Sequence, residues 1–193
     1  MSFVDKFRSH FGKHQDFSKT SRYEVMIFSP EKLTKYLASP EGLRFQCETA
    51  ELPGYNINTV ERRIYGAPAA VAINPVYNDL SLTFICAGDL WEKKYFDDWM
   101  DFIVPKGQYN HSPQYREDYV STFTIKSYSE MATDVKAADT KDQTGMLAME
   151  TRIYGVFPTS VAPISLSWAG DDVNRLSVTF KYKSWERIEK KTQ

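Results

Sequence analysis

Cysteine and histidine are scarce in this chain, which limits the chemistry that it can perform. Its 193 residues include two cysteines and three histidines. Cys47 and Cys86 each lie in an alternating apolar segment without a CxxC spacing, so we expect buried, reduced thiols, although the sequence alone leaves a disulfide open. His10 and His14 stand four residues apart, as zinc ligands can, but no Cys, Asp or Glu accompanies them at a suitable spacing. We therefore expect no metal site and no cofactor.

An excess of charge of either sign is also missing. The formal net charge is −1, whereas proteins that hold nucleic acid carry a basic excess that neutralises phosphates. Stable binding of DNA or RNA is therefore not expected. No apolar run approaches the roughly 20 residues of a membrane span, and Met1–Phe7 lacks the hydrophobic segment of a signal peptide. These features favour folding in a reducing cytoplasm, without a membrane anchor.

The common catalytic motifs are absent as well. The patterns GxSxG, HExxH, GxGxxG and the phosphate-binding GxxxxGK[ST] do not occur. Asp97, Asp98 and Asp101 form an acidic group, but we find no histidine or basic partner at an offset that would make it catalytic. We interpret these three side chains as the solvated face of a helix, and we expect a protein that is not an enzyme.

The sequence does contain two short motifs that each occur twice. Residues 61–66 read ERRIYG and residues 150–155 read ETRIYG, while residues 80–84 read LSLTF and residues 176–180 read LSVTF. An imperfect internal repeat is one interpretation, and chance recurrence in a β-rich chain is the other. With no catalytic motif between the copies, this pattern is typical of a building block.

Hydrophobic periodicity predicts a mainly β fold. The strand at 56–65 has no cleanly apolar side, which indicates packing against another chain. Residues 67–75 are expected to form an extended loop, and Pro158 and Pro163 to bracket a turn. The other strands are expected at 22–28, 43–50, 80–86, 119–128 and 146–157, with a hairpin formed by 164–168 and 176–182.

Two helices complete the predicted elements. Residues 89–103 carry an aromatic face at helical spacing, with Asp89 as the expected N-cap and Glu92 as its capping-box partner. A short N-terminal helical arm is predicted over residues 1–21, because Phe3, Phe7 and Phe11 stand four residues apart. We therefore predict one domain over residues 1–193. Its expected fold is a β-sandwich or barrel of about eight or nine antiparallel strands with one flanking α-helix and a short N-terminal helix.

Two segments are predicted to be loops. Residues 105–118 are polar and include three side chains suited to contacts, Tyr109, His111 and Tyr115. Residues 132–144 are charged and carry no helix or strand pattern.

Four stretches of the chain, taken in their order, resemble the tail tube proteins of T4-like contractile bacteriophages. They are 45–54 (FQCETAELPG), 80–103 with FDDW at 96–99, 154–161 (YGVFPTSV) and 176–186. The resemblance implies a subunit that forms six-fold rings, which stack into the inner tube of the tail and enclose a channel for DNA ejection. The implied partners are further copies of the chain and the sheath, tape-measure, baseplate and tail terminator proteins. DNA would pass without stable binding, and the implied location is the virion tail, assembled in the host cytoplasm.

The same resemblance suggests where subunits meet. The strands at 56–65 and 147–156 are expected to form inter-subunit contacts or the channel wall, with their arginines neutralised by acidic neighbours such as Glu61 and Glu150. The residues concerned are Glu61, Arg62, Arg63, Tyr65, Glu150, Arg152 and Tyr154. The loop at 132–144 is expected to order on ring stacking, through Asp134, Lys136, Asp139, Lys141 and Asp142.

Other classes of protein remain open at this point. A baseplate tube-initiator protein or a type VI secretion tube protein would share the same fold. A monomeric ligand-binding β-barrel would instead contain a ligand-sized cavity. An enzyme would need a pocket with perturbed acids, for example around Asp97, Asp98 and Asp101.

Overall fold

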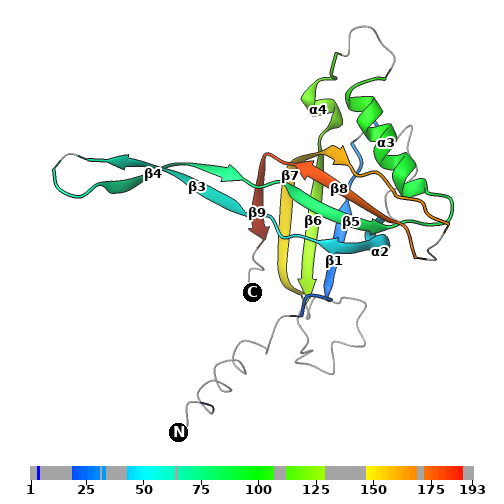
Figure 1. Ribbon diagram of the computed structural model, residues 1–193, viewed down its shortest axis with the longest axis horizontal. Coiled ribbons are helices and arrows are strands. Elements are labelled where there is room, and N and C mark those ends of the chain that lie inside the picture. Colours follow the sequence, from blue (N-terminus) through cyan, green and yellow to red (C-terminus); the bar gives the residue numbers. More distant parts are fainter. Residues whose placement is uncertain are drawn as a thin grey trace.

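The computed structural model describes residues 4, 19–30, 32–33, 43–63, 65–106, 112–128, 147–168 and 172–188. Within these ranges the fold is mainly β, with antiparallel strands and a few helices, as predicted (Figure 1). Most of the N-terminal arm at 1–21 and the whole loop at 132–144 lie outside the described residues. The elements are β1 (Tyr23–Ile27), α2 (Leu43–Gln46), β2 (Cys47–Ala50), β3 (Tyr55–Arg62), β4 (Ala69–Tyr77), β5 (Leu80–Ile85), α3 (Trp91–Ile103), α4 (Arg116–Tyr119), β6 (Ser121–Tyr128), β7 (Leu147–Val161), β8 (Arg175–Lys181) and β9 (Ser184–Ile188).

The body of the molecule is a seven-stranded sheet that bends at β7. The strand order is β1-β6-β7-β8-β5-β2, and β9 pairs with β7 as well. The first half of β7 lies between β6 and β9, whereas its second half pairs with β8. Figure 1 shows β5 and β8 running across the direction of β1 and β6. One long strand therefore belongs to both halves of a sandwich.

Gly155 makes the bend in β7 possible. The register with β6 shifts between Ser121↔Val156 and Thr122↔Tyr154, so that Gly155 is the extra residue of a β-bulge. Its φ of 66° lies in the left-handed region that side chains disfavour. A Cβ atom at this position would stand 3.1 Å from Cβ of Lys183. Glycine is thus required at this corner both by the backbone and by the available space.

The hydrophobic core lies between the two halves of the sheet and under α3. Phe123 of β6 and Phe180 of β8 approach to 5.0 Å between ring centroids. Phe96 of α3 lies 5.8 Å from Phe180, and Trp99 of α3 lies 6.4 Å from Phe123. The indole nitrogen of Trp99 donates a hydrogen bond to the carbonyl of Tyr119 at 3.0 Å. The aromatic face predicted for this helix is therefore what joins the two halves.

The start of α3 differs from the predicted capping box. Leu90, with φ 52°, occupies the N-cap position, and Asp89 accepts only a 3.4 Å hydrogen bond from the backbone of Trp91. The buried carboxylate of Glu92 accepts the backbone N–H of Ala87, with both oxygens at 3.1 Å. A turn closed by Leu90 N–H and the carbonyl of Ala87 brings this earlier amide under the helix. Glu92 therefore caps the turn that precedes the helix.

Three predicted strand and loop boundaries were wrong. Residues 43–46 form α2 instead of a strand, because β2 begins opposite Phe84, near the end of β5, and earlier residues have no strand to pair with. Residues 69–75, part of the loop expected at 67–75, belong to β4, which continues to Tyr77. Pro158 lies inside β7 and not in a turn. Among the described strands, β4 pairs only with β3, and the part of β7 that contains Pro158 pairs only with β8, so both segments are edge strands, where proline is tolerated.

Two further expectations need correction. Residues 164–168 do not form a strand, and β8 pairs with the end of β7 instead. Residues 116–118, assigned to a loop, and Tyr119, assigned to the following strand, form α4, which Val120 N–H closes on the carbonyl of Arg116 at 3.2 Å. Cys47 and Cys86 are free thiols, as expected, but only Cys86 is buried, whereas Cys47 is half-buried. Among the described residues, no helix has the length and apolar character needed to cross a bilayer.

Candidate assembly interface

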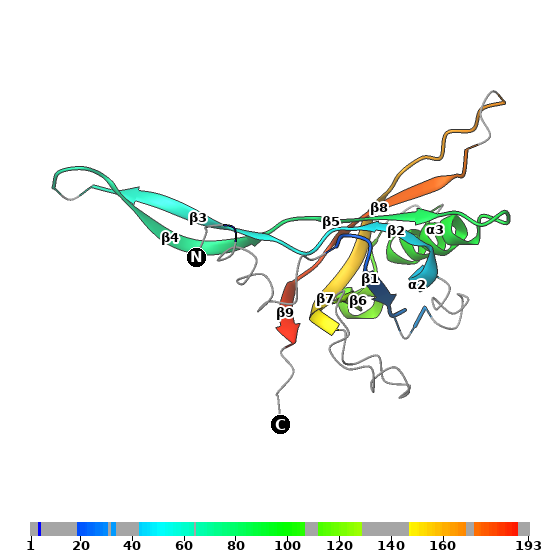
Figure 2. The same ribbon diagram turned by 90° about the horizontal axis from the view of Figure 1, so that it is seen from below.

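A hairpin of β3 and β4 projects from the body of the molecule (Figures 1 and 2). In the described structure these two strands pair only with each other. Ile57 lies opposite Pro75, and Val60 lies opposite Val71. Because Ile57 and Val60 are an odd number of residues apart, these pairs point to opposite faces of the ribbon. Every residue of β3 is exposed, and so is every residue of β4 before Tyr77.

This exposure makes the hairpin an unusual element for an isolated chain. Ile57 is 55% exposed and Ile73 is 63% exposed, and Val60, Val71 and Val76 are exposed too. A two-stranded ribbon in water is marginally stable by itself, and its two open edges can pair with other strands. The ribbon therefore carries apolar side chains and backbone groups that the described part of this chain leaves uncovered.

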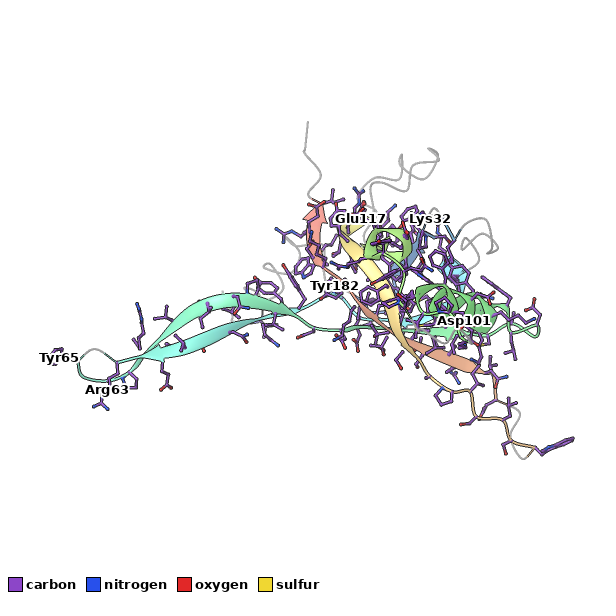
Figure 3. The ribbon with its side chains drawn as sticks, turned by 90° about the horizontal axis from the view of Figure 1, so that it is seen from above. Lys32, Arg63, Tyr65, Asp101, Glu117 and Tyr182 are labelled. Carbon is purple, nitrogen blue, oxygen red and sulfur yellow. The ribbon has the colours of Figure 1, made fainter. Side chains whose placement is uncertain are left out.

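The root of the hairpin, in contrast, is firmly held by aromatic rings. Tyr55 lies 6.3 Å from Tyr77 and 6.0 Å from Trp185, between ring centroids. Tyr77 in turn lies 5.7 Å from Tyr182. The hydroxyl of Tyr182 donates a 3.0 Å hydrogen bond to the carbonyl of Gly54, just before β3 (Figure 3). These contacts fix the direction in which the hairpin leaves the body.

The first motif copy lies at the far end of this hairpin. Glu61 and Arg62 end β3, and Arg63 donates a 3.0 Å hydrogen bond from Nε to the carbonyl of Gly66. Figure 3 shows Arg63 and Tyr65 at the tip, remote from the body. Tyr65 is 96% exposed. The predicted pairing with Glu61 is not the contact that Arg63 makes.

The second motif copy lies on β7, where Ile153 belongs to the core while Glu150, Arg152 and Tyr154 occupy the opposite face of the sheet. Across β1, β6, β7 and β9, opposite charges stand in register on this face: Glu24↔Lys126, Lys126↔Glu150 and Arg152↔Glu186. Arg152 also lies 3.5 Å from Glu150. The Tyr154 hydroxyl donates to Glu186, which raises the pKa of that phenol, since the neighbouring carboxylate disfavours phenolate. This face is charged but locally neutralised.

The charged face surrounds a hollow of about 450 Å³. Its walls come from β1, β6 and β7, together with residues just beyond these strands. The lining residues are Met26, Phe28, Thr122, Thr124, Lys126, Glu150, Arg152 and Tyr154. The structure therefore gathers Glu150, Arg152 and Tyr154 here, while Glu61, Arg62, Arg63 and Tyr65 belong to the separate hairpin.

The LSLTF and LSVTF motifs lie side by side. Strands β5 and β8 pair antiparallel, with Leu80 opposite Phe180 and Phe84 opposite Leu176. The side chains of Thr83 and Ser177 lie 3.1 Å apart in a hydrogen bond. The shared pattern thus encodes two equivalent halves of one ladder, whereas the ERRIYG and ETRIYG copies occupy different environments.

The acidic group on α3 is paired with lysines. Lys93 Nζ lies 2.8 Å from Asp97, and Lys106 Nζ lies 2.7 Å from Asp101. Asp98 is exposed. The expectation that no basic partner stands at a matching offset was wrong, because Lys93 precedes Asp97 by one helical turn. Within the described ranges, no three His, Cys, Asp or Glu side chains are placed to hold a metal ion.

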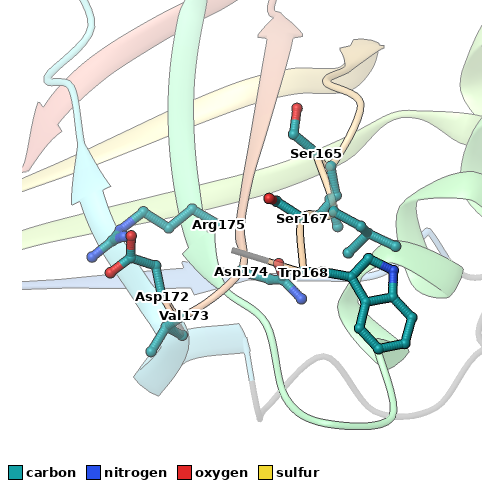
Figure 4. Close-up of a pocket in the computed structure, with 9 residues that line it drawn as sticks. Ser165, Ser167, Trp168, Asp172, Val173, Asn174 and Arg175 are labelled. Carbon is teal, nitrogen blue, oxygen red and sulfur yellow. The ribbon is translucent and has the colours of Figure 1, made fainter. Parts of the chain in front are cut away.

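A second exposed surface, which the sequence patterns did not predict, is the β7–β8 arm, comprising residues 162–168 and 172–174. Leu166, Trp168 and Val173 are exposed here, and Trp168 fully so. The segment borders a cavity of about 660 Å³ (Figure 4). The backbone of Cys86 donates a 2.9 Å hydrogen bond to the carbonyl of Asn174, which anchors the arm. Its apolar residues alternate as they do in a buried strand, and only Pro163 indicated that the segment is not a strand.

Five residues of the predicted stacking loop lie outside the described part of the chain. They are Asp134, Lys136, Asp139, Lys141 and Asp142. Tyr109 and His111 lie outside it as well, whereas Tyr115 is described and exposed.

The described fold thus combines a bent seven-stranded sheet, a helix over its core and a projecting hairpin with exposed apolar residues. The sequence pattern of the phage tail tube protein family matches residues 18–188, so the chain belongs to that family. Among curated protein sequences, none matches this chain significantly.

Solved structures show the same fold. A chain of the anti-feeding prophage baseplate, solved with six-fold symmetry imposed, is 10% identical with a TM-score of 0.62, over 91% of this chain and 97% of that one. A chain of the sheath–tube complex of an extracellular contractile injection system is 13% identical with a TM-score of 0.58, over 97% and 99%. A chain from the sheath/tube terminator of such a system is 15% identical with a TM-score of 0.57, over 89% and 96%.

Proposed function

We propose that this chain is the repeated subunit of the inner tube of a bacteriophage contractile tail. Six copies form a ring, stacked rings form the tube, and the enclosed channel carries DNA on ejection. The observation that carries the proposal is the β3–β4 hairpin, whose apolar residues on both faces are uncovered in the single chain. A neighbouring copy supplies the missing cover.

The position of this hairpin favours growth into an extended assembly. It leaves the body at one end, on a root fixed by Tyr55, Tyr77 and Tyr182. A surface on one end that meets a different surface on the next copy makes a head-to-tail contact. Such contacts close into rings when the rotation allows it and otherwise continue as filaments. A tube of stacked rings needs both kinds of contact: contacts that close each ring, and contacts that continue from one ring to the next.

The charged face of β1, β6, β7 and β9 is our candidate for the channel wall. A conduit for DNA must not retain phosphates, so its positive charges need partners. On this face Lys126 and Arg152 each stand opposite a glutamate in the strand register. Glu150, Arg152 and Tyr154 would then line the channel, while Glu61, Arg62, Arg63 and Tyr65 on the hairpin would meet neighbouring subunits.

The partners follow from this role. The tube would be surrounded by the sheath protein, filled by the tape-measure protein during assembly, and bounded by baseplate and terminator proteins. It would be assembled in the host cytoplasm and reside in the virion tail. The chain itself would have no catalytic activity.

A second candidate is the tube of an injection system that carries no genome. It is favoured by the fold shared with the sheath–tube complex of an extracellular contractile injection system. A tube-like protein of the baseplate is a further candidate, since a chain of the anti-feeding prophage baseplate has this fold as well. Capsid and terminase genes beside the coding gene would support the phage tail, and their absence would support the injection system.

Electron microscopy of the purified protein over a range of concentrations tests the proposal, with light scattering on the same samples. Straight hollow tubes of constant width, or rings with six-fold symmetry, are expected above a threshold concentration. A monomer at every concentration, even after addition of tube fragments as seeds, would refute the role as a tube subunit.

A further inference from the structure

The charges of the β3–β4 hairpin are gathered at its tip. Residues 55–77 include three charged side chains, Glu61, Arg62 and Arg63, which are adjacent and leave one excess positive charge. All three are exposed, and the β4 residues opposite Glu61 and Arg62 are alanines, which cannot neutralise them. Tyr65 stands beside them at the tip (Figure 3). Arginine and tyrosine are enriched among the residues that dominate binding energy at interfaces.

The β7–β8 arm has the opposite charge. Its described residues, 162–168 and 172–174, contain one charged side chain, the exposed Asp172. Arg175, which follows the arm, lies 2.6 Å from Glu48 and also close to Asp172 (Figure 4). Two carboxylates thus share one guanidinium, which leaves one excess negative charge at the base of the arm.

The arm also presents an aromatic ring to a partner. Trp168 is fully exposed, and Leu166 and Val173 beside it are exposed as well. All three border the cavity of about 660 Å³. A guanidinium over a tryptophan ring makes a favourable cation–π contact, and hot-spot residues of one surface tend to pair with hot spots of the other. The arm therefore suits a partner that presents arginine and an aromatic side chain on a narrow projection.

The hairpin tip and the arm lie at opposite ends of the molecule. In Figures 1 and 2 the hairpin projects to the left, whereas the segment between β7 and β8 lies on the right. One chain cannot bring its own tip onto its own arm, but two copies placed head to tail can join them. Because the tip of the second copy stays free, such a contact can be repeated from copy to copy.

We infer that the hairpin tip of one subunit docks on the β7–β8 arm of a second copy of this chain. Arg62, Arg63 and Tyr65 of the tip then meet Trp168 and Asp172 of the arm. This inference rests on the proposed function, because it names the surface that the projecting hairpin contacts on its neighbour.

An exchange of charges between the two surfaces is the first test. Arg62→Glu gives the tip one excess negative charge, and Asp172→Arg gives the base of the arm one excess positive charge. Each substitution alone sets like charges against each other and is expected to raise the threshold concentration for assembly about 10-fold. A chain that carries both restores opposite charges at every contact, so its threshold should return close to that of the wild type.

Asp98→Arg is the matched control for the exchange. Asp98 is an exposed acidic residue on α3, outside both surfaces, and this substitution changes the net charge as Asp172→Arg does. Alone it should leave the threshold unchanged, and combined with Arg62→Glu it should not restore assembly. The melting temperature of the unassembled protein should stay the same in all these variants, because the replaced side chains are exposed.

Disulfide trapping tests the position of the contact. Ala67, at the tip, and Ser165, on the arm, are both exposed. Ala67→Cys and Ser165→Cys, prepared as two separate proteins and mixed under oxidising conditions, should give disulfide-linked dimers that neither forms alone. Each protein alone controls for Cys47 and Cys86, which are half-buried and buried.

The outcomes separate this inference from the proposed function. If the wild type assembles, the charge exchange decides. Restored assembly in the double variant supports the contact. Unchanged thresholds in the single variants, as expected if the arm faces a different protein, overturn it and leave the tube standing. A double variant that assembles no better than the single variants overturns it as well.

A wild type that never assembles, even with tube fragments as seeds, would refute the tube. The contact between tip and arm is then judged by the trapped dimers alone. Their presence keeps it, and their absence overturns it.

Discussion

Replacing the two exposed isoleucines of the hairpin should block assembly without affecting the fold. Ile57 and Ile73 are each more than half exposed in the single chain. Full burial of an isoleucine stabilises by roughly 1.5–3 kcal/mol, so covering the exposed part of each side chain contributes about 1–2 kcal/mol. The double substitution Ile57→Ser and Ile73→Ser therefore removes about 2–4 kcal/mol from each contact that the hairpin makes.

This loss corresponds to a rise of about 30-fold to 800-fold in the threshold concentration for assembly. The measurement is a pelleting assay across protein concentrations, with the melting temperature of the unassembled protein measured in parallel. Because both side chains are exposed, the melting temperature should not change. Val104→Ser serves as the matched control, because Val104 is an exposed apolar residue at the end of α3, away from the hairpin.

An unchanged threshold in the double variant would contradict the reasoning directly. It would mean that the uncovered apolar residues of β3 and β4 do not meet a neighbouring subunit. A raised threshold accompanied by a lower melting temperature would show instead that these residues stabilise the chain itself.

Three further predictions concern the fold. Gly155→Ala should lower the melting temperature by roughly 2–8 °C in calorimetry, because a residue with a Cβ atom pays about 1–2 kcal/mol for the left-handed backbone conformation. Gly88→Ala is the control and should have little effect, because nothing would crowd its methyl group. Equal effects of the two substitutions would contradict the role of Gly155 at the bend in β7. Glu92→Ala should destabilise by about 1–3 kcal/mol in denaturant unfolding, because the Ala87 amide loses its acceptor, whereas Glu92→Gln keeps an acceptor oxygen and should cost less. Burial raises the pKa of the Cys47 thiol to about 12, so alkylation by iodoacetamide should stay slow as the pH rises past 9 and increase only toward 12; rapid modification of the folded protein at pH 8.5 would contradict this burial.

Local patterns were sufficient to predict the buried elements. The alternation in LSLTF and LSVTF places every second residue in the core, and both segments became paired strands. The aromatic spacing of residues 89–103 likewise predicted α3, because Trp99 follows Phe96 by three residues and Tyr95 by four, which places all three on one helix face. In these segments the buried residues recur with the two-residue period of a strand or the 3.6-residue period of a helix, so the sequence alone predicts the secondary structure.

Pairing partners and tertiary context decided the segments that were predicted incorrectly. Residues 43–46 alternate as a strand does, yet no neighbouring strand extends far enough to pair with them. Residues 164–168 alternate as well, but their apolar side chains remain exposed. Of the hairpin, only the strand at 56–65 was predicted, with the expectation that it packs against another chain, whereas residues 67–75 were expected to be a loop. The exposure of Trp168 was not predicted, because the alternating segment 164–168 has the same sequence pattern as a strand buried within its own chain.

The course of β7 has a mechanical consequence. Its fifteen residues run unbroken through both halves of the sheet. A load applied to the β8 ladder therefore passes along covalent bonds into the β6 and β9 ladders and does not depend on side-chain packing alone. The subunit responds to tension as one piece.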